Sequence, residues 1–215
     1  MLALISPAKK LDFESKKPLS TLSQPDFLDK ANILVKAAKT LNKKDLARTM
    51  KISEKLAELN VKRFKDFSTP FNLTNAKQAA FMFKGDTYVG LDIESLSEKE
   101  LQFAQSHLRI LSGLYGILRP LDLIQPYRLE MGAKFQPPKK TNLYDFWTPQ
   151  LTDAINAELS QHDNKTIINL ASNEYSKVIQ FKKIQGTVIN PIFKEIKDGK
   201  TRTLGMYAKR ARGMM

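Results

Sequence analysis

The sequence contains no cysteine, and only two of its 215 residues are histidine. Without cysteine, disulfides, thiolate metal ligands and thiol nucleophiles are all excluded. His107 and His162 are far apart in the chain, and two histidines are too few for a histidine-rich metal cluster. The residues therefore predict no metal site and no cofactor, although a site made of carboxylates stays open.

Long hydrophobic runs are also missing. No window reaches the roughly 18 apolar residues that a membrane span needs. The apolar start at residues 2–5 follows no basic region, which argues against a signal peptide. We expect a cytoplasmic protein with no membrane partner.

Acidic residues are the scarcer sign of charge. The chain has 22 Asp and Glu against 35 Lys and Arg, a formal net charge of +13. Such a basic protein favours polyanions, because bound cations neutralise phosphates and release counterions. A basic surface that is simply solvated explains the same count equally well.

Hydrophobic periodicity indicates strands alternating with helices. Short apolar runs predict strands over 2–5, 79–84, 165–170, 186–193 and 202–206. Helical spacing predicts helices over 25–41, 45–50, 53–64, 97–111, 143–159 and 174–179, although 108–111 could instead begin a strand and Pro149 could delay the start at 143 to Trp147. We expect one α/β domain over 1–215, with α+β as the alternative, in which helices cover a mixed sheet.

Two places bring charge to the end of a predicted strand. Lys9 and Lys10 follow the strand at 2–5, at the carboxyl edge where α/β sheets bind ligands. Asp86 follows Gly85 in a predicted turn between the strand at 79–84 and an extended piece at 88–90, where a carboxylate can act as a base or a ligand. Solvated lysines and an ordinary Gly-Asp turn are the plain alternatives.

The stretch 108–132, LRILSGLYGILRPLDLIQPYRLEMG, combines an apolar sequence with charges and turn-forming residues. Its first half resembles a helix, a glycine hairpin and a second helical turn. In such an element the bare backbone N–H groups contact phosphate. The phosphate-contacting residues would be Ser112, Gly113, Tyr115 and Gly116, with Arg119 beyond them. The two residues between the glycines depart from the usual spacing of one, and a glycine turn inside the core is the alternative.

The second half of this stretch suggests catalysis. In Tyr127-Arg128-Leu129-Glu130, Arg128 and Glu130 share one side if the segment is extended. Together with Lys9 and Asp86 they could hold an anion and move protons. A structural ion pair between Arg128 and Glu130 is the alternative.

The end of the chain carries the densest basic cluster. Lys209, Arg210 and Arg212 follow Tyr207, and on a helix they would present cations for phosphate contacts. A solvated basic tail is the alternative.

Five segments together resemble the bacterial YaaA peroxide-stress family: LISPAKKLD (4–12), FKGDTYVGL (83–91), the stretch 108–132, INLASNEYSKVI (168–179) and YAKRARGMM (207–215). The resemblance implies a cytoplasmic protein that limits free intracellular iron, and hence Fenton damage to DNA. It also implies a single α/β fold with a basic cleft and a helix-hairpin-helix-like element, associated with DNA binding. Our leading hypothesis is a stress protein that binds DNA without sequence specificity. Family members continue beyond the segment that ends here at Met215, so we expect a C-terminal tail of the family to be absent.

Two alternatives to a DNA-binding protein stay open. One is an enzyme acting on a nucleotide-like or phosphorylated small molecule through Lys9, Asp86, Tyr127, Arg128 and Glu130. The other is a scaffold whose basic surface meets an acidic protein.

Overall fold

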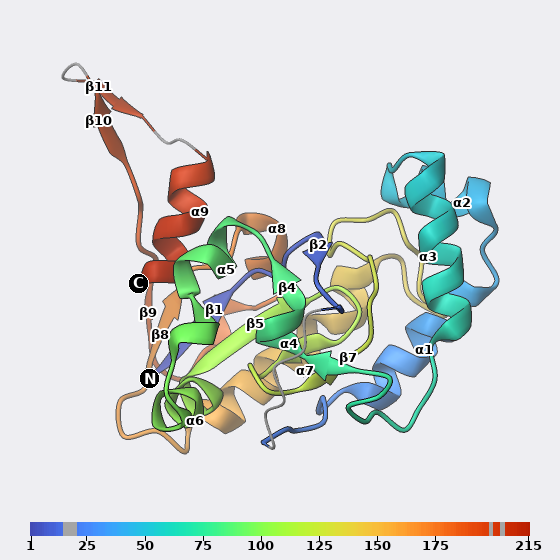
Figure 1. Cartoon of the computed structure of the whole chain (residues 1–215). Coiled ribbons are helices and arrows are strands. Elements are labelled where there is room, and N and C mark those ends of the chain that lie inside the picture. The colour runs from blue at the N-terminus through green and yellow to red at the C-terminus, as the bar shows by residue number, and fades with distance from the viewer. Residues whose placement is uncertain (15–20, 198–199, 203–204) are drawn as a thin grey trace.

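The computed structural model describes residues 1–14, 21–197, 200–202 and 205–215 (Figure 1). The helices are α1 (Leu28–Lys39), α2 (Lys43–Met50), α3 (Glu54–Asp66), α4 (Ala79–Met82), α5 (Asp86–Leu91), α6 (Glu98–His107), α7 (Leu143–Leu159), α8 (Asn173–Ser176) and α9 (Gly205–Met214), with 3-10 turns η1 (Ile93–Ser95) and η2 (Phe181–Lys183). The strands are β1 (Leu2–Ile5), β2 (Lys10–Leu11), β3 (Lys77–Gln78), β4 (Phe83–Lys84), β5 (Leu108–Ser112), β6 (Gly116–Leu118), β7 (Leu123–Ile124), β8 (Thr166–Asn169), β9 (Thr187–Ile189), β10 (Glu195–Lys197) and β11 (Lys200–Arg202).

A mixed sheet of five strands forms the centre, in the order β6-β5-β1-β8-β9. The pairs β5–β1, β1–β8 and β8–β9 are parallel, and β6 returns antiparallel to β5. The first strand lies in the middle, where Leu2, Leu4 and Ile5 are buried, as expected for a short, wholly apolar strand in a parallel sheet. The predicted α/β class with a mixed sheet is confirmed.

The boundary between α6 and β5 shows pairing overriding helical periodicity. The capping box of Ser97 and Glu100 begins α6 as predicted. The helix ends at His107, and Leu108 begins a strand that pairs with Ala3 of β1. The helix predicted over 97–111 is therefore too long, and the alternative of a strand from 108 is confirmed.

Residues 79–90 differ from the prediction. The apolar run Ala79–Met82 is a buried single helical turn, and only Phe83–Lys84 is a strand. Asp86 begins α5, so the extended piece expected at 88–90 is wrong. The physical reason is tertiary, because β4 pairs with β2 over two residues only and the chain then turns beneath α9.

Helix α7 begins at Leu143, and the later start near Trp147 is wrong. The Asn142 side chain accepts a hydrogen bond from the Asp145 backbone N–H at 3.0 Å and so caps the first turn ahead of Pro149. Trp147 is completely buried, as expected for a packing residue. Even with this 17-residue helix included, the described part of the chain contains no helix long and apolar enough to cross a membrane.

The last part of the chain forms an arm followed by a helix. Strands β10 and β11 pair as an antiparallel hairpin that extends from the body in Figure 1. A strand was predicted over 202–206. The observed strand β11 ends at Arg202, residues 203–204 lie outside the described residues, and Gly205 begins α9. Helix α9 then returns to pack against α5.

Candidate functional site

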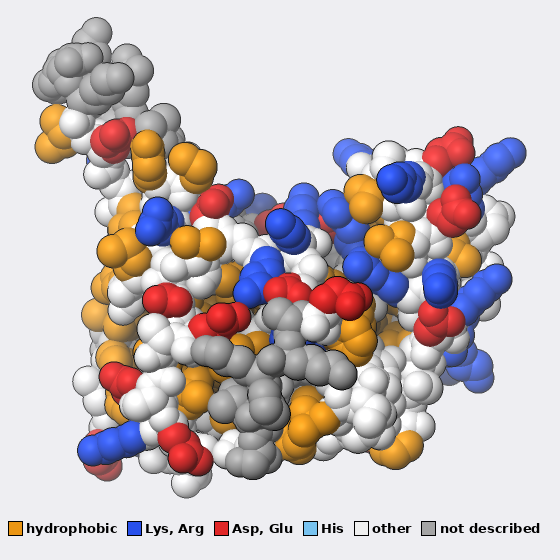
Figure 2. Space-filling model, in the orientation of Figure 1, with side chains coloured by type: hydrophobic (Ala, Val, Ile, Leu, Met, Phe, Trp, Pro, Cys, Tyr) orange, Lys and Arg blue, Asp and Glu red, His pale blue; other side chains and the backbone are white. Residues whose placement is uncertain are grey.

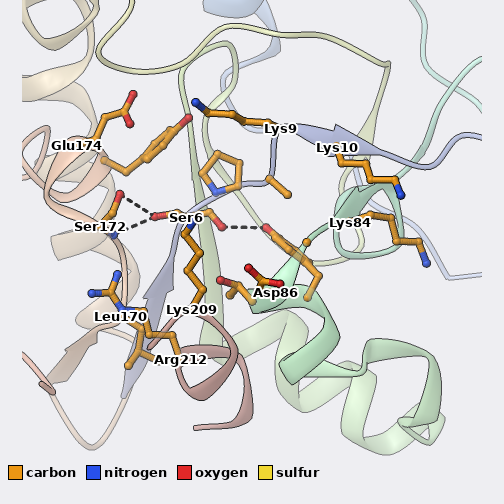
Figure 3. A pocket seen from close by; sticks show the side chains of 16 residues that line it. Ser6, Lys9, Lys10, Lys84, Asp86, Leu170, Ser172, Glu174, Lys209 and Arg212 are labelled. Carbon is orange, nitrogen blue, oxygen red and sulfur yellow. Dashed lines mark hydrogen bonds between the residues drawn. The ribbon is translucent and has the colours of Figure 1, made fainter. Parts of the chain in front are cut away.

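A pocket of about 330 Å³ opens at the carboxyl ends of β1 and β8 (Figure 3). Four segments line it: the residues after β1, the start of α5, the residues after β8, and α9. Lys9, Lys10 and Asp86 all line this pocket. The structure thus brings the two lysines together with Asp86, which lies far from them in the sequence, at the edge of the sheet where ligands bind in α/β folds.

The base of the pocket is held by hydrogen bonds between the two strand ends. The Ser6 hydroxyl donates to the Ser172 hydroxyl at 3.2 Å and accepts from the Ser172 backbone N–H at 2.9 Å. The Tyr88 hydroxyl donates to the Ser6 carbonyl at 3.1 Å. These bonds join β1, α5 and the β8–α8 connection, so the pocket has a rigid floor.

Two glycines allow α9 to pack closely against α5 beside the pocket. A side chain at Gly213 would collide with the backbone carbonyl of Thr87, and one at Gly90 with the carbonyl of Arg210. Because both positions lack a Cβ, the backbones of α5 and α9 approach closely. This packing brings Lys209 and Arg212 into the pocket wall, and Figure 3 shows Lys209 extending into the pocket.

A charged cluster lies beside this pocket. The Glu130 Oε1 atom lies 2.9 Å from the Arg128 guanidinium and 3.5 Å from Lys9 Nζ. The Oε2 atom is buried and has no hydrogen-bond partner among the described residues. Glu130 also lines a cavity of about 20 Å³, room for one water. The predicted sharing of one side by Arg128 and Glu130 is confirmed, and the interaction is an ion pair.

Tyr127 lies next to this cluster with its ring buried. Its hydroxyl is 2.7 Å from the Ser112 hydroxyl. Burial raises the pKa of Tyr127, and the nearby Glu130 charge raises that pKa further. The phenol therefore stays protonated at neutral pH and serves as a hydrogen-bonding group rather than as a base.

Arg63 of α3 is a site residue that sequence reasoning missed. Burial lowers its pKa, and the positive charge of Arg128 lowers that pKa further, so the two cations act on each other electrostatically. Arg63 has no ion pair with any residue that the structure describes. Nothing in the sequence pattern of α3 distinguishes Arg63 from the exposed lysines of the same helix.

These cations form a basic track, defined as Lys209, Arg212, Lys9, Arg128 and Arg63. Lys9 lines both the pocket and the small cavity, which makes the track continuous from α9 towards α3. Figure 2 shows a hollow between the α9 side and the α2–α3 side, with Lys and Arg gathered along its floor and one wall among a few acids. Within the described residues, the only ion pairs of the track are those of Lys9 and Arg128 with Glu130.

The glycine hairpin differs from the prediction in its flanking elements and in its burial. Its flanks are strands β5 and β6, so the predicted helix-hairpin-helix is wrong. Ser112, Leu114 and Tyr115 are completely buried, and the Ser112 hydroxyl already accepts the N–H groups of residues 114 and 115. The hairpin thus offers phosphate no exposed backbone.

The glycines of this hairpin serve packing. The Trp147 indole donates to the Gly113 carbonyl at 3.0 Å. Gly116 has a φ of +73°, and a Cβ there would lie 2.8 Å from the Trp147 ring. The alternative of a glycine turn inside the core describes these residues.

Two further candidate phosphate contacts lie outside the pocket. The Arg119 guanidinium is 2.9 Å from Asp26 and 3.0 Å from Asp122, so it fastens the segment before α1 to the core. Arg210 is exposed on α9 but does not line the pocket. Of the predicted basic group, the structure therefore places Lys209 and Arg212 together in the site.

The two histidines are neighbours in space. Their ring centroids lie 4.9 Å apart, although the two residues are far apart in the chain. Burial lowers the pKa of His162, and the charges of His107 and Arg109 contribute in the same direction. No group of three or more His, Cys, Asp or Glu side chains suited to a metal ion occurs within the described ranges.

Fold and pocket together define an α/β protein with a cation-lined pocket at the carboxyl edge of its central sheet. A family model described as peroxide stress protein YaaA matches residues 1–215, and the chain belongs to this family. It is 49% identical over 215 residues to a UPF0246 protein of Aliivibrio fischeri and 53% identical to one of Shewanella baltica, covering 100% of this chain and 83% and 84% of those proteins. The family resemblance drawn from the five segments is confirmed, and the family description supports a role in peroxide stress.

Proposed function

We propose that this protein acts in the peroxide-stress response by binding DNA without sequence specificity, with backbone phosphates lying along the basic track. The observation that carries the proposal is the charge of the track: of its five cations, only Lys9 and Arg128 form ion pairs with described residues, both with Glu130. Half-buried guanidinium groups with a like-charged neighbour are stabilised when an anion lies between them. Contacts of this kind position a phosphate backbone and carry no base information.

The track replaces the hairpin in this proposal. Lys9, Lys209 and Arg212 of the track line an open pocket, whereas the hairpin is buried. Long-range attraction from the net charge of +13 adds to both the affinity and the rate of association.

Limitation of free iron belongs to the same proposal. Its support is the family resemblance together with the description of the family model. In a bacterium that lacks its own family member, expression of this chain is expected to lower the free iron detected by electron paramagnetic resonance during peroxide exposure. Free iron that is unchanged by expression of the chain would remove this part of the proposal.

Arg63→Gln is expected to weaken DNA binding and to lower the slope of log affinity against log salt by about 1. Arg63 forms no ion pair with any described residue, so its charge is available to a phosphate, and the substitution removes that contact. The measurement is fluorescence anisotropy of a labelled duplex, alongside a bubbled duplex, over a series of salt concentrations. Lys36→Gln, on the exposed face of α1, is the control of equal charge. Equal slopes for the two variants would place the DNA away from Arg63.

A second candidate function is a reaction on a nucleotide-like or phosphorylated small molecule. One observation favours it: Lys9 and Asp86, which come from different segments, line one pocket with Lys209. For this candidate Asp86 is the group available to accept a proton, since it forms no ion pair or hydrogen bond with any residue in the described part of the chain.

Asp86→Asn separates the two functions. It is expected to abolish peroxide protection in a complementation assay without weakening DNA binding, because the substitution removes no cation of the track. Protection equal to that of the unmodified chain would count against a reaction at this pocket.

A further inference from the structure

We propose that the pocket binds a small phosphomonoester, no larger than a mononucleotide, with its phosphate against Lys209 and Arg212 of α9. This names the ligand of the second candidate function and does not depend on DNA binding along the track. The argument rests on charge, on an unpartnered guanidinium nitrogen, and on the shape of the pocket.

The charge of the α9 wall matches a dianion. Lys209 and Arg212 are three residues apart, so they lie on neighbouring turns of one helix face. Both line the pocket, and neither makes an ion pair with a residue in the described ranges. A phosphomonoester carries nearly two negative charges at neutral pH, which fits two adjacent uncompensated cations.

Arg212 also has an unused donor. Its Nε atom is buried and has no hydrogen-bond partner among the residues that the structure describes. A buried N–H without an acceptor destabilises the protein. A phosphate oxygen satisfies it, because the planar guanidinium fork matches phosphate geometry.

The wall next to α9, where α5 begins, determines what the phosphate is attached to. Asp86 lines the same pocket, and its negative charge disfavours a second anionic group there. Its carboxylate instead accepts hydrogen bonds from hydroxyl or amino groups. Pro7, Ala8, Leu170 and the rings of Tyr88 and Tyr175 supply apolar lining. A ligand with a phosphate at one end and a flat or sugar-like polar body at the other fits both walls.

The size of the pocket limits the ligand. A volume of about 330 Å³ is at the low end for small-molecule sites and excludes a duplex. Its floor is the rigid serine pair Ser6 and Ser172. The ligand therefore enters from the hollow and ends in the pocket.

The test is isothermal titration of the full chain with AMP, adenosine and inorganic phosphate. AMP is expected to bind saturably and about tenfold or more tightly than adenosine, since a charge-assisted hydrogen bond is lost without the phosphate. The double variant K209Q/R212Q should weaken AMP binding by about tenfold or more. The double variant K36Q/K99Q removes the same charge from exposed sites on α1 and α6 and should bind AMP as the unmodified chain does.

Two further measurements identify the source of the phosphomonoester and check that the double variant is folded. A short single strand with a 5′-phosphate is compared with its 5′-hydroxyl form; competition with AMP by the phosphorylated form alone supports the same chemistry and assigns it to strand ends. Circular dichroism confirms that K209Q/R212Q is folded. Arg63→Gln should keep full AMP binding, so failure of the DNA proposal is distinguishable. Equal affinity for AMP and adenosine, no saturable binding of AMP, or equal binding by both double variants would overturn the inference.

Discussion

Gly213→Ala is expected to release α9 from α5 and to remove Lys209 and Arg212 from the site. The added methyl group would meet the Thr87 carbonyl and lie 2.7 Å from the Leu91 backbone nitrogen, and neither backbone group can turn aside as a flexible side chain does. Overpacking of this kind costs about 1–3 kcal/mol, which is comparable to the free energy that holds one terminal helix in place. Hydrogen exchange of residues 205–215 should become fast while β1 and β8 stay protected.

Gly205→Ala is the matched control for this prediction. It adds the same methyl group to the same helix, at a position with no atom within 4 Å. Alanine has a higher helix propensity than glycine, so this variant should keep α9 in place. AMP and DNA affinities should fall for Gly213→Ala and remain normal for Gly205→Ala. Slow exchange of α9 in Gly213→Ala would show that the two helices are not held by this close contact.

Gly113→Ala is expected to destabilise the whole fold rather than to act on DNA binding. A Cβ at this position would collide with the Leu129 carbonyl in the buried core, where the Gly113 carbonyl also accepts the Trp147 indole N–H. The expected loss is about 1–3 kcal/mol of unfolding free energy, read from the urea midpoint. The sequence places Gly113 among the predicted phosphate contacts, and the burial of the hairpin reverses that expectation.

Gly132→Ala is the control for this second prediction. Its Cβ would lie 3.2 Å from the Glu174 carboxylate oxygen, and a flexible side chain can move by the few tenths of an ångström required. Its urea midpoint should stay close to that of the unmodified chain. At a temperature where the Gly113→Ala variant is still folded, the DNA affinity of that variant should equal that of the unmodified chain. A weaker affinity in that folded protein would return the hairpin to consideration as a DNA contact.

Local patterns predicted much of the fold. The apolar run after Met1 is the central strand, and the Ser97–Glu100 capping box begins its helix. These features depend on residues that are neighbours in the chain, so they can be read without knowledge of the fold. Boundaries failed where a distant segment competed, as at Leu108, which leaves the helix to pair with Ala3.

The candidate site was predictable only in part. Because Lys9 follows a predicted strand, the sequence indicated that it lies at the carboxyl edge of the sheet, and it does line the pocket there. The alternating side-chain directions of an extended segment indicated that Arg128 and Glu130 lie on the same side. Arg63 was not predictable, because its electrostatic interaction with Arg128 joins residues more than sixty positions apart in the chain. The histidine pair escaped for the same reason, since sequence separation was a poor guide to distance.

By itself the sequence determined the α/β class, the family and the excess of positive charge, because composition, periodicity and shared motifs are properties of the chain. Only the tertiary structure decided which charges work together. It buried the glycine hairpin beneath Trp147 and placed α9 over the end of β1, because close backbone approach at Gly113 and Gly213 depends on which surfaces meet in three dimensions. The basic track and its pocket are consequences of that packing.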